Sequence, residues 1–169
     1  MKKPVNYTVV CAILVVVQIA IGALLHLPSY LAINLLPVVV ALMPVRVNTN
    51  VSLLLAFGIG LVTDLFTTGM LGFSSVALLP VALLRIPLLL GISGREILTH
   101  KSESPSTYLS TSSLVLFIFA SNLVFQLIAV TMDCAGLFSA GHVILCALGS
   151  SVASTVAGYL VGRYLISEK

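Results

Sequence analysis

Long apolar runs, separated by short breaks, occupy most of this chain of 169 residues. A helix needs about 20 predominantly apolar residues to cross the hydrocarbon core of a bilayer. Hydrophobic residues make up 59% of the chain and charged residues only 8%, which lies far outside the composition of soluble domains. The sequence therefore predicts one all-α integral-membrane domain over 1–169, solvated mainly by the lipid bilayer.

The breaks between the apolar runs contain Pro, Gly, Asn or Ser, the residues that interrupt helices. They divide the chain into a six-helix transmembrane bundle and leave no room for a soluble domain. The first apolar run exceeds the roughly 7 to 15 residues of a secretory signal, so we expect it to remain as a span. The expected spans are 5–25, 27–43, 51–66, 71–92, 112–132 and 141–166.

Basic residues fall on one side of the expected membrane. Cytoplasmic loops of membrane proteins collect Lys and Arg. With six spans, seven of the eight basic residues fall on the side of the N-terminus, and the loops on the opposite side contain none. We therefore expect a multi-pass protein with both termini in the cytoplasm. These residues form no stripe, which argues against nucleic-acid binding. They are Lys2, Lys3, Arg46, Arg95, Lys101, Arg163 and Lys169.

One acidic residue, Asp64, stands in a glycine-rich apolar segment that runs from Gly58 to Phe73. A charged side chain at the centre of a bilayer costs roughly 2.5 to 3.5 kcal/mol, so its presence indicates a packing role or a site. A turn of Thr67, Thr68 and Gly69 follows it. We expect the carboxylate to accept hydrogen bonds from backbone N–H groups that begin the next helix. An ion, proton or partner site at the outer face is the functional alternative.

Arg85 lies in the fourth expected span, about 21 Å below its outer end. There its side chain is expected to snorkel to the cytoplasmic interface. Asp64 would then lie at the opposite end of the hairpin, so we predict no salt bridge between the two. Pro37 in the second span and Pro80 and Pro87 in the fourth are expected to kink their helices.

Small residues recur every four positions in the last expected span, at Ser150, Ser154, Gly158 and Gly162. Such a ridge lets another helix backbone approach closely. Packing within the chain is the default, and a helix of another protein is the alternative. Gly58 and Gly60 are expected to serve the same purpose in the third span.

The polar inventory offers no recognisable catalytic or metal-binding set. His26 and His142 lack a carboxylate or cysteine at a defined spacing, so they are weak evidence for a metal site. No Ser-His-Asp set, paired acids or phosphate loop is present in the sequence. We therefore expect no enzymatic activity, no cofactor and no metal.

The segment from Gly58 to Pro87 resembles the MreD family, the rod-shape-determining membrane proteins of bacteria. The resemblance rests on a Gly-x-x-x-Asp-Leu-Phe run with Asp64, a Leu-Gly-Phe run with Gly72, and the arginine that ends the fourth span. Upstream, Ile33-Asn-Leu-Leu-Pro37 is similar to the form found in relatives from Bacteroidota.

The resemblance implies a non-catalytic inner-membrane subunit of the elongation machinery that controls cell shape. Its implied partners are the single-span periplasmic scaffold MreC, the peptidoglycan synthases and, indirectly, the actin-like MreB filament. The predicted structural or partner-binding residues are Asn34, Pro37, Gly60, Asp64, Gly69, Gly72, Arg85, Ser154, Gly158 and Gly162.

The family also resembles the substrate-binding subunits of energy-coupling-factor transporters in its six-helix arrangement. A micronutrient-binding subunit of this kind is therefore the alternative function. Those subunits carry an Ala-x-x-x-Ala pair on the first span, whereas Ala12, Ala20 and Ala23 are not spaced by four. The chain also has no Trp, a favoured stacking residue for ring-shaped ligands.

Overall fold

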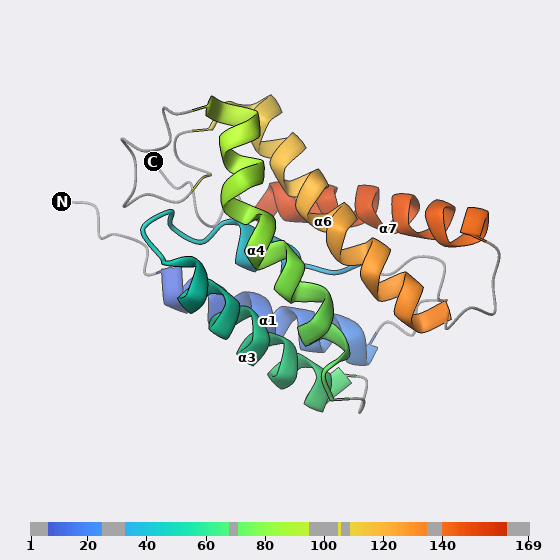
Figure 1. The fold of residues 1–169 in the computed structure, drawn as a ribbon. Coiled ribbons are helices and arrows are strands. Elements are labelled where there is room, and N and C mark those ends of the chain that lie inside the picture. Colours follow the sequence, from blue (N-terminus) through green and yellow to red (C-terminus); the bar gives the residue numbers. More distant parts are fainter. Residues whose placement is uncertain are drawn as a thin grey trace.

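A computed structural model describes residues 7–24, 33–67, 71–94, 105, 109–134 and 140–161. All regular structure in this part of the chain is helical (Figure 1), which confirms the all-α prediction there. Five of the helices each fill most of an expected span, whereas α2 covers only 6 residues of the second expected span, 27–43. The helices are α1 (Tyr7–Leu24), α2 (Leu36–Ala41), α3 (Thr49–Thr67), α4 (Phe73–Ser93), α6 (Thr111–Cys134) and α7 (Ala140–Val161).

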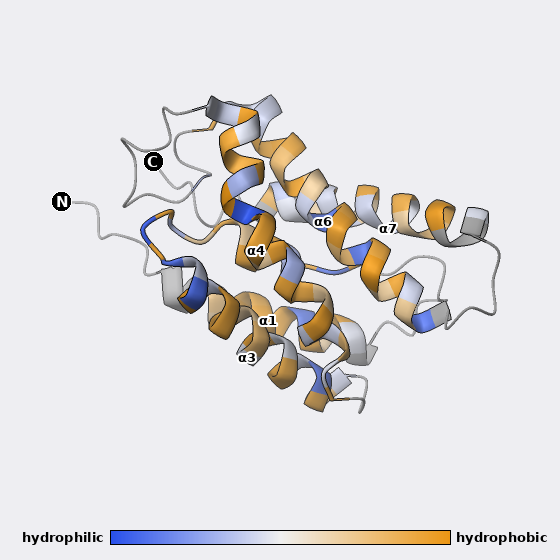
Figure 2. Ribbon diagram, in the orientation of Figure 1, coloured by the Kyte–Doolittle hydropathy of each residue, from blue (hydrophilic) through white to orange (hydrophobic). Residues whose placement is uncertain are grey.

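Three of these helices, α3, α4 and α6, are long and apolar enough to cross a membrane. Their mean hydropathy lies between 1.6 and 2.2. Shorter apolar stretches lie in α1, at Cys11–Gly22, and in α7, at Ile144–Leu160. Figure 2 shows that apolar residues dominate along the described helices. The fold is therefore that of a helical bundle with three helices able to span a bilayer.

The five longer helices surround the short helix α2. Helix α4 packs against α3 and α6, while α6 also packs against α7 and α1 packs against α3. Helix α2 contacts α1, α3, α4 and α6. Because it touches so many neighbours, α2 forms the centre of the bundle rather than part of its wall.

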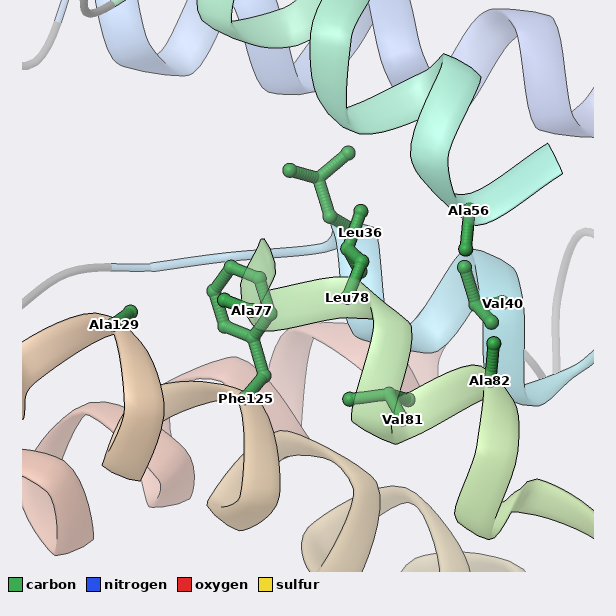
Figure 3. Close-up of a cluster of buried hydrophobic side chains, with 9 residues drawn as sticks. All are labelled: Leu36, Val40, Ala56, Ala77, Leu78, Val81, Ala82, Phe125 and Ala129. Atoms are coloured by element: carbon green, nitrogen blue, oxygen red, sulfur yellow. The ribbon is translucent and has the colours of Figure 1, made fainter. Parts of the chain in front are cut away.

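Every residue of α2 is buried, and Leu36 and the residues from Val38 to Ala41 are each at most 1% exposed. Leu36 and Val40 join a cluster with residues of α3, α4 and α6, and Figure 3 places Val40 between Ala56 and Ala82. On another side of the helix, Val39 packs with Leu14 of α1. A helix that is apolar all round is a buried helix, so the sequence of α2 fits its central position.

The prediction of one continuous helix over 27–43 is wrong in its described part. Residues 33–35 are not helical, and α2 has only 6 residues, about 9 Å in length. Pro37 lies in the first turn of α2, where a missing N–H has no cost. Pro44 follows, and it disfavours helical geometry in the residue before it. Pro37 therefore begins a helix instead of kinking one.

The two prolines of α4 have a different effect from Pro37. Pro80 and Pro87 both lie inside this helix, which continues from Phe73 to Ser93. Neither residue ends the helix, so α4 keeps the length needed to reach from one end of the bundle to the other.

Candidate functional site

The carboxylate of Asp64 caps the start of α4. Its side chain is fully buried near the end of α3. Oδ2 accepts a hydrogen bond from the Gly72 N–H at 2.9 Å, and the Ser74 N–H lies 3.0 Å from both carboxylate oxygens. The first N–H groups of a helix have no partner within it. The predicted capping role of Asp64 is therefore confirmed.

Gly72 gives the turn before α4 the shape that this cap requires. It is the N-cap residue of α4 and has a φ of 98°, in the left-handed region that glycine tolerates and other residues disfavour. This conformation directs the N–H groups of Gly72 and Ser74 toward the same carboxylate. Gly69, also predicted to act in this turn, lies outside the described residues.

Gly60 brings the backbones of α3 and α4 into direct contact. A Cβ at this position would lie 2.5 Å from the Ser75 Cα and 2.6 Å from its nitrogen. The Ser75 hydroxyl also donates a hydrogen bond to the Phe57 carbonyl at 3.0 Å, which holds the two helices together. The same expectation for Gly58 is wrong, because a Cβ there would meet nothing within 4 Å.

The Arg85 side chain is buried, with only 1% exposed, so the expectation that it snorkels to the surface is wrong. Nη1 donates to the Met43 carbonyl at 3.2 Å, and Nη2 donates to the carbonyls of Pro44 at 3.4 Å and Val47 at 3.2 Å. These carbonyls belong to the linker between α2 and α3, and backbone groups outside regular structure need such partners when they are removed from solvent. Because α2 is short, the segment that follows it lies over the guanidinium and encloses it.

Asp64 and Arg85 fasten opposite ends of the α3–α4 hairpin. Arg85 lies about 16 Å further along α4 than Ser74, which Asp64 contacts. The carbonyls that Arg85 contacts precede the start of α3, whereas Asp64 is near its end. This separation agrees with the prediction that the two residues do not pair.

We predict that Asp64→Asn lowers the free energy of unfolding by about 1–2 kcal/mol. An amide has one accepting oxygen, and its NH₂ group would face the N–H groups of Gly72 or Ser74. The thermal midpoint in mild detergent measures the effect, and membrane fractionation should show unchanged insertion. Asp133→Asn is the control, because Asp133 is exposed at the end of α6. Equal midpoints for the two variants would contradict the capping role.

A buried amide in α1, Gln18, holds the non-helical segment before α2. Oε1 accepts a hydrogen bond from the Leu35 N–H at 2.8 Å. Nε2 donates to the Ile33 carbonyl at 3.4 Å and to Asn34 Oδ1 at 3.0 Å. Buried backbone groups outside regular structure need such partners. Gln18 thus supplies hydrogen bonds that a continuous helix would have made itself.

The small-residue ridge of α7 packs within the chain. Ser154 Oγ accepts a hydrogen bond from the Asn34 N–H at 3.0 Å. A Cβ on Gly158 would lie 2.5 Å from Val38 Cγ2 and 3.1 Å from Ile118 Cγ2. The ridge therefore faces the segment around α2 and the helix α6, which confirms for these two residues the default expectation of packing within the chain. Gly162 lies outside the described residues.

A second buried amide, Asn122 in α6, makes fewer hydrogen bonds than Gln18. Its side chain is fully buried, and Nδ2 donates to Thr155 Oγ1 of α7 at 3.3 Å. In the part of the chain that the structure describes, Oδ1 has no hydrogen-bond partner. Of these two buried amides, Gln18 uses both its oxygen and its nitrogen in hydrogen bonds, whereas Asn122 uses only its nitrogen.

We predict that Gln18→Leu costs about 2–3 kcal/mol of stability, because it leaves the Leu35 N–H and the Ile33 carbonyl without this partner. Asn122→Leu is the matched control and should cost less than about 1 kcal/mol, since it removes an unsatisfied acceptor. Thermal midpoints in the same detergent compare the two. Equal losses would show that Gln18 does not hold the segment.

The sequence reasoning missed Gln18, although a signal was present. A polar amide within an apolar helix is costly when buried without hydrogen bonds. Its position alone therefore indicates a partner inside the bundle. Its partners lie in the non-helical segment 33–35. The pattern of apolar residues does not reveal that this segment is non-helical.

The buried polar groups described above form hydrogen bonds that connect helices to each other or to the segments between them. No group of three or more His, Cys, Asp or Glu that could hold a metal occurs in the described ranges. His26 and the side chain of His142 lie outside them. The geometry thus defines an all-helical protein, with three helices able to cross a membrane, whose buried polar residues hold the bundle together. Comparison with protein-family models, curated proteins and solved structures finds no match.

Proposed function

We propose that the chain is an MreD-like, non-catalytic inner-membrane subunit of a bacterial rod-shape complex. The observation that carries the proposal is the convergence of the motif residues on one hairpin. Gly60 lets α3 and α4 touch, Asp64 and Gly72 shape their turn, and Arg85 fastens the other end. A motif that builds a rigid surface suits a protein that works by holding partners.

The proposed topology has six membrane crossings with both termini in the cytoplasm. In the described ranges, Arg46 and Arg85 are the only basic residues, and both lie at the end of the bundle where α3 begins. Basic residues at one end support the positive-inside orientation. In this topology the second crossing includes α2, which has 6 residues and is too short to cross a bilayer alone.

The proposed mechanism is positional. The complex partners are an MreC-like single-span periplasmic scaffold, the peptidoglycan synthases and, through them, an MreB-like filament. The bundle presents large apolar side chains outward, including Leu54 and Leu145 at 72% exposure. Such faces suit contact with lipid and with helices of other membrane proteins. The rigid hairpin would keep the outer turn in place while partners assemble around it.

The substrate-binding subunit of an energy-coupling-factor transporter remains the alternative, and one observation favours it. Transporters often place their binding sites where a membrane helix is interrupted, and the chain is non-helical at residues 33–35. Gln18, Asn34 and Ser154 meet there. Their hydrogen bonds to each other and to the backbone favour a structural use of these polar groups over ligand binding.

Depletion of the protein in its own rod-shaped host tests the proposal. We expect rods to become spheres, and we expect excess vitamins in the medium to have no effect on this change. Re-expression of the native chain should restore cell width, and Asp64→Asn should restore it only in part. Retention of rod shape during depletion, or rescue by a vitamin, would contradict the proposal.

A further inference from the structure

An apolar groove of about 750 Å³ lies between α1 and α3. It lies apart from the contacts of the α3–α4 hairpin, and no charged residue lines it. Residues that line it include Ala12, Val16, Leu55, Gly58, Val62 and Phe66.

The groove opens to the outside of the bundle. Val16 and Phe66 on its two walls are 64% and 67% exposed. Gly58 leaves room between the helices, because a Cβ there would meet nothing within 4 Å. The groove is thus an open channel along the protein surface and not a sealed cavity.

The length of the groove matches a lipid chain. The lining residues of α3 run from Leu54 to Phe66, about 18 Å along the helix axis. One leaflet contributes about half of the roughly 30 Å of bilayer hydrocarbon. Helix α3 is also long and apolar enough to cross the membrane, so the groove would run beside hydrocarbon.

A positive charge lies at one end of the helix that forms the groove. Arg46 belongs to the linker just before α3, and its side chain is exposed. Anionic lipid headgroups attract basic residues at the membrane surface. The apolar groove complements an acyl chain, and the cation at the start of the same helix complements an anionic headgroup. Together they fit an anionic phospholipid.

We propose that this surface binds an anionic phospholipid, with one acyl chain in the α1–α3 groove and the phosphate at Arg46. The assignment is independent of the proposed cell-shape function. The lipid would fill the space between two helices that otherwise touch over a limited area, and it would join them at the membrane surface.

Native mass spectrometry of the purified full chain tests the assignment, with palmitoyl-oleoyl phosphatidylglycerol as the probe and the matching phosphatidylethanolamine as the reference. We expect preferential retention of one phosphatidylglycerol. Gly58→Leu should fill the groove and lower its retention to the level of the reference lipid. Arg46→Gln should lower the affinity about fivefold, which corresponds to roughly 1 kcal/mol for one basic residue near a membrane.

Gly91→Leu is the matched control. Gly91 lies in α4, away from the groove, and a Cβ there also meets nothing within 4 Å. This variant should retain phosphatidylglycerol as the native chain does. Unchanged retention in Gly58→Leu would overturn the proposal. Loss of a co-purifying membrane protein from Gly58→Leu, with lipid retention unchanged, would also overturn it and assign the groove to a partner helix.

Discussion

Replacement of Arg85 by methionine is expected to lower the free energy of unfolding by about 3 kcal/mol, given roughly 1 kcal/mol for each of three buried hydrogen bonds. The carbonyls of Met43, Pro44 and Val47 would lose this donor, while methionine keeps much of the apolar volume. Arg85→Lys should have an intermediate effect, because an ammonium lacks the planar fork of donors. Thermal midpoints and resistance to proteolysis in detergent measure the series.

Arg46→Met is the control for the loss of charge. Arg46 is exposed in the same linker, and in detergent without added phospholipid such a surface substitution usually changes stability by no more than about 0.5 kcal/mol. A midpoint for Arg85→Met close to that of Arg46→Met would show that the buried guanidinium does not fasten the linker to α4.

Gly60→Ala and Gly58→Ala are expected to change stability in opposite directions. Alanine in a helix interior is favoured over glycine by about 0.5–1 kcal/mol, and Gly58 has room for the added methyl group. At Gly60 the methyl group would meet the Ser75 backbone, and such overpacking costs about 1–3 kcal/mol. The backbone cannot rotate away as a side chain could, so we expect the upper end of that range.

The paired design separates packing from helix propensity, because both substitutions occur in α3 and add the same atoms. Chemical denaturation or heating in detergent gives the two shifts. If Gly60→Ala stabilised the protein as much as Gly58→Ala, the close contact between α3 and α4 would be refuted.

The role of Asp64 could be predicted because its partners are local. Gly72 and Ser74 follow it by 8 and 10 positions, and the intervening turn residues mark the end of one helix and the start of another. The acceptor and the donors therefore appear together in one short stretch of sequence. The partners of Arg85 precede it by 38 to 42 positions, and no local pattern connects them.

The short central helix explains why the expectations for 27–43 and Arg85 are wrong and why Gln18 was missed. Hydropathy does not distinguish a buried helix from a membrane span when both are apolar, so the sequence predicts one span over 27–43. Pro37 lies in the first turn of α2 and Pro44 follows its end, so the two prolines, interpreted as helix boundaries, predict its length. Because α2 is short, residues 33–35 have backbone groups that hydrogen-bond to Gln18. For the same reason the carbonyls after α2 accept hydrogen bonds from Arg85.

Affinity purification of the tagged protein at native expression, in mild detergent, tests the proposed function most directly. Identification of the bound proteins separates the two functional classes, because their partners do not overlap. The account predicts recovery of a single-span periplasmic scaffold together with peptidoglycan synthases. Recovery of two ATPases and a coupling membrane subunit, without wall synthases, would contradict it and assign the chain to a transporter.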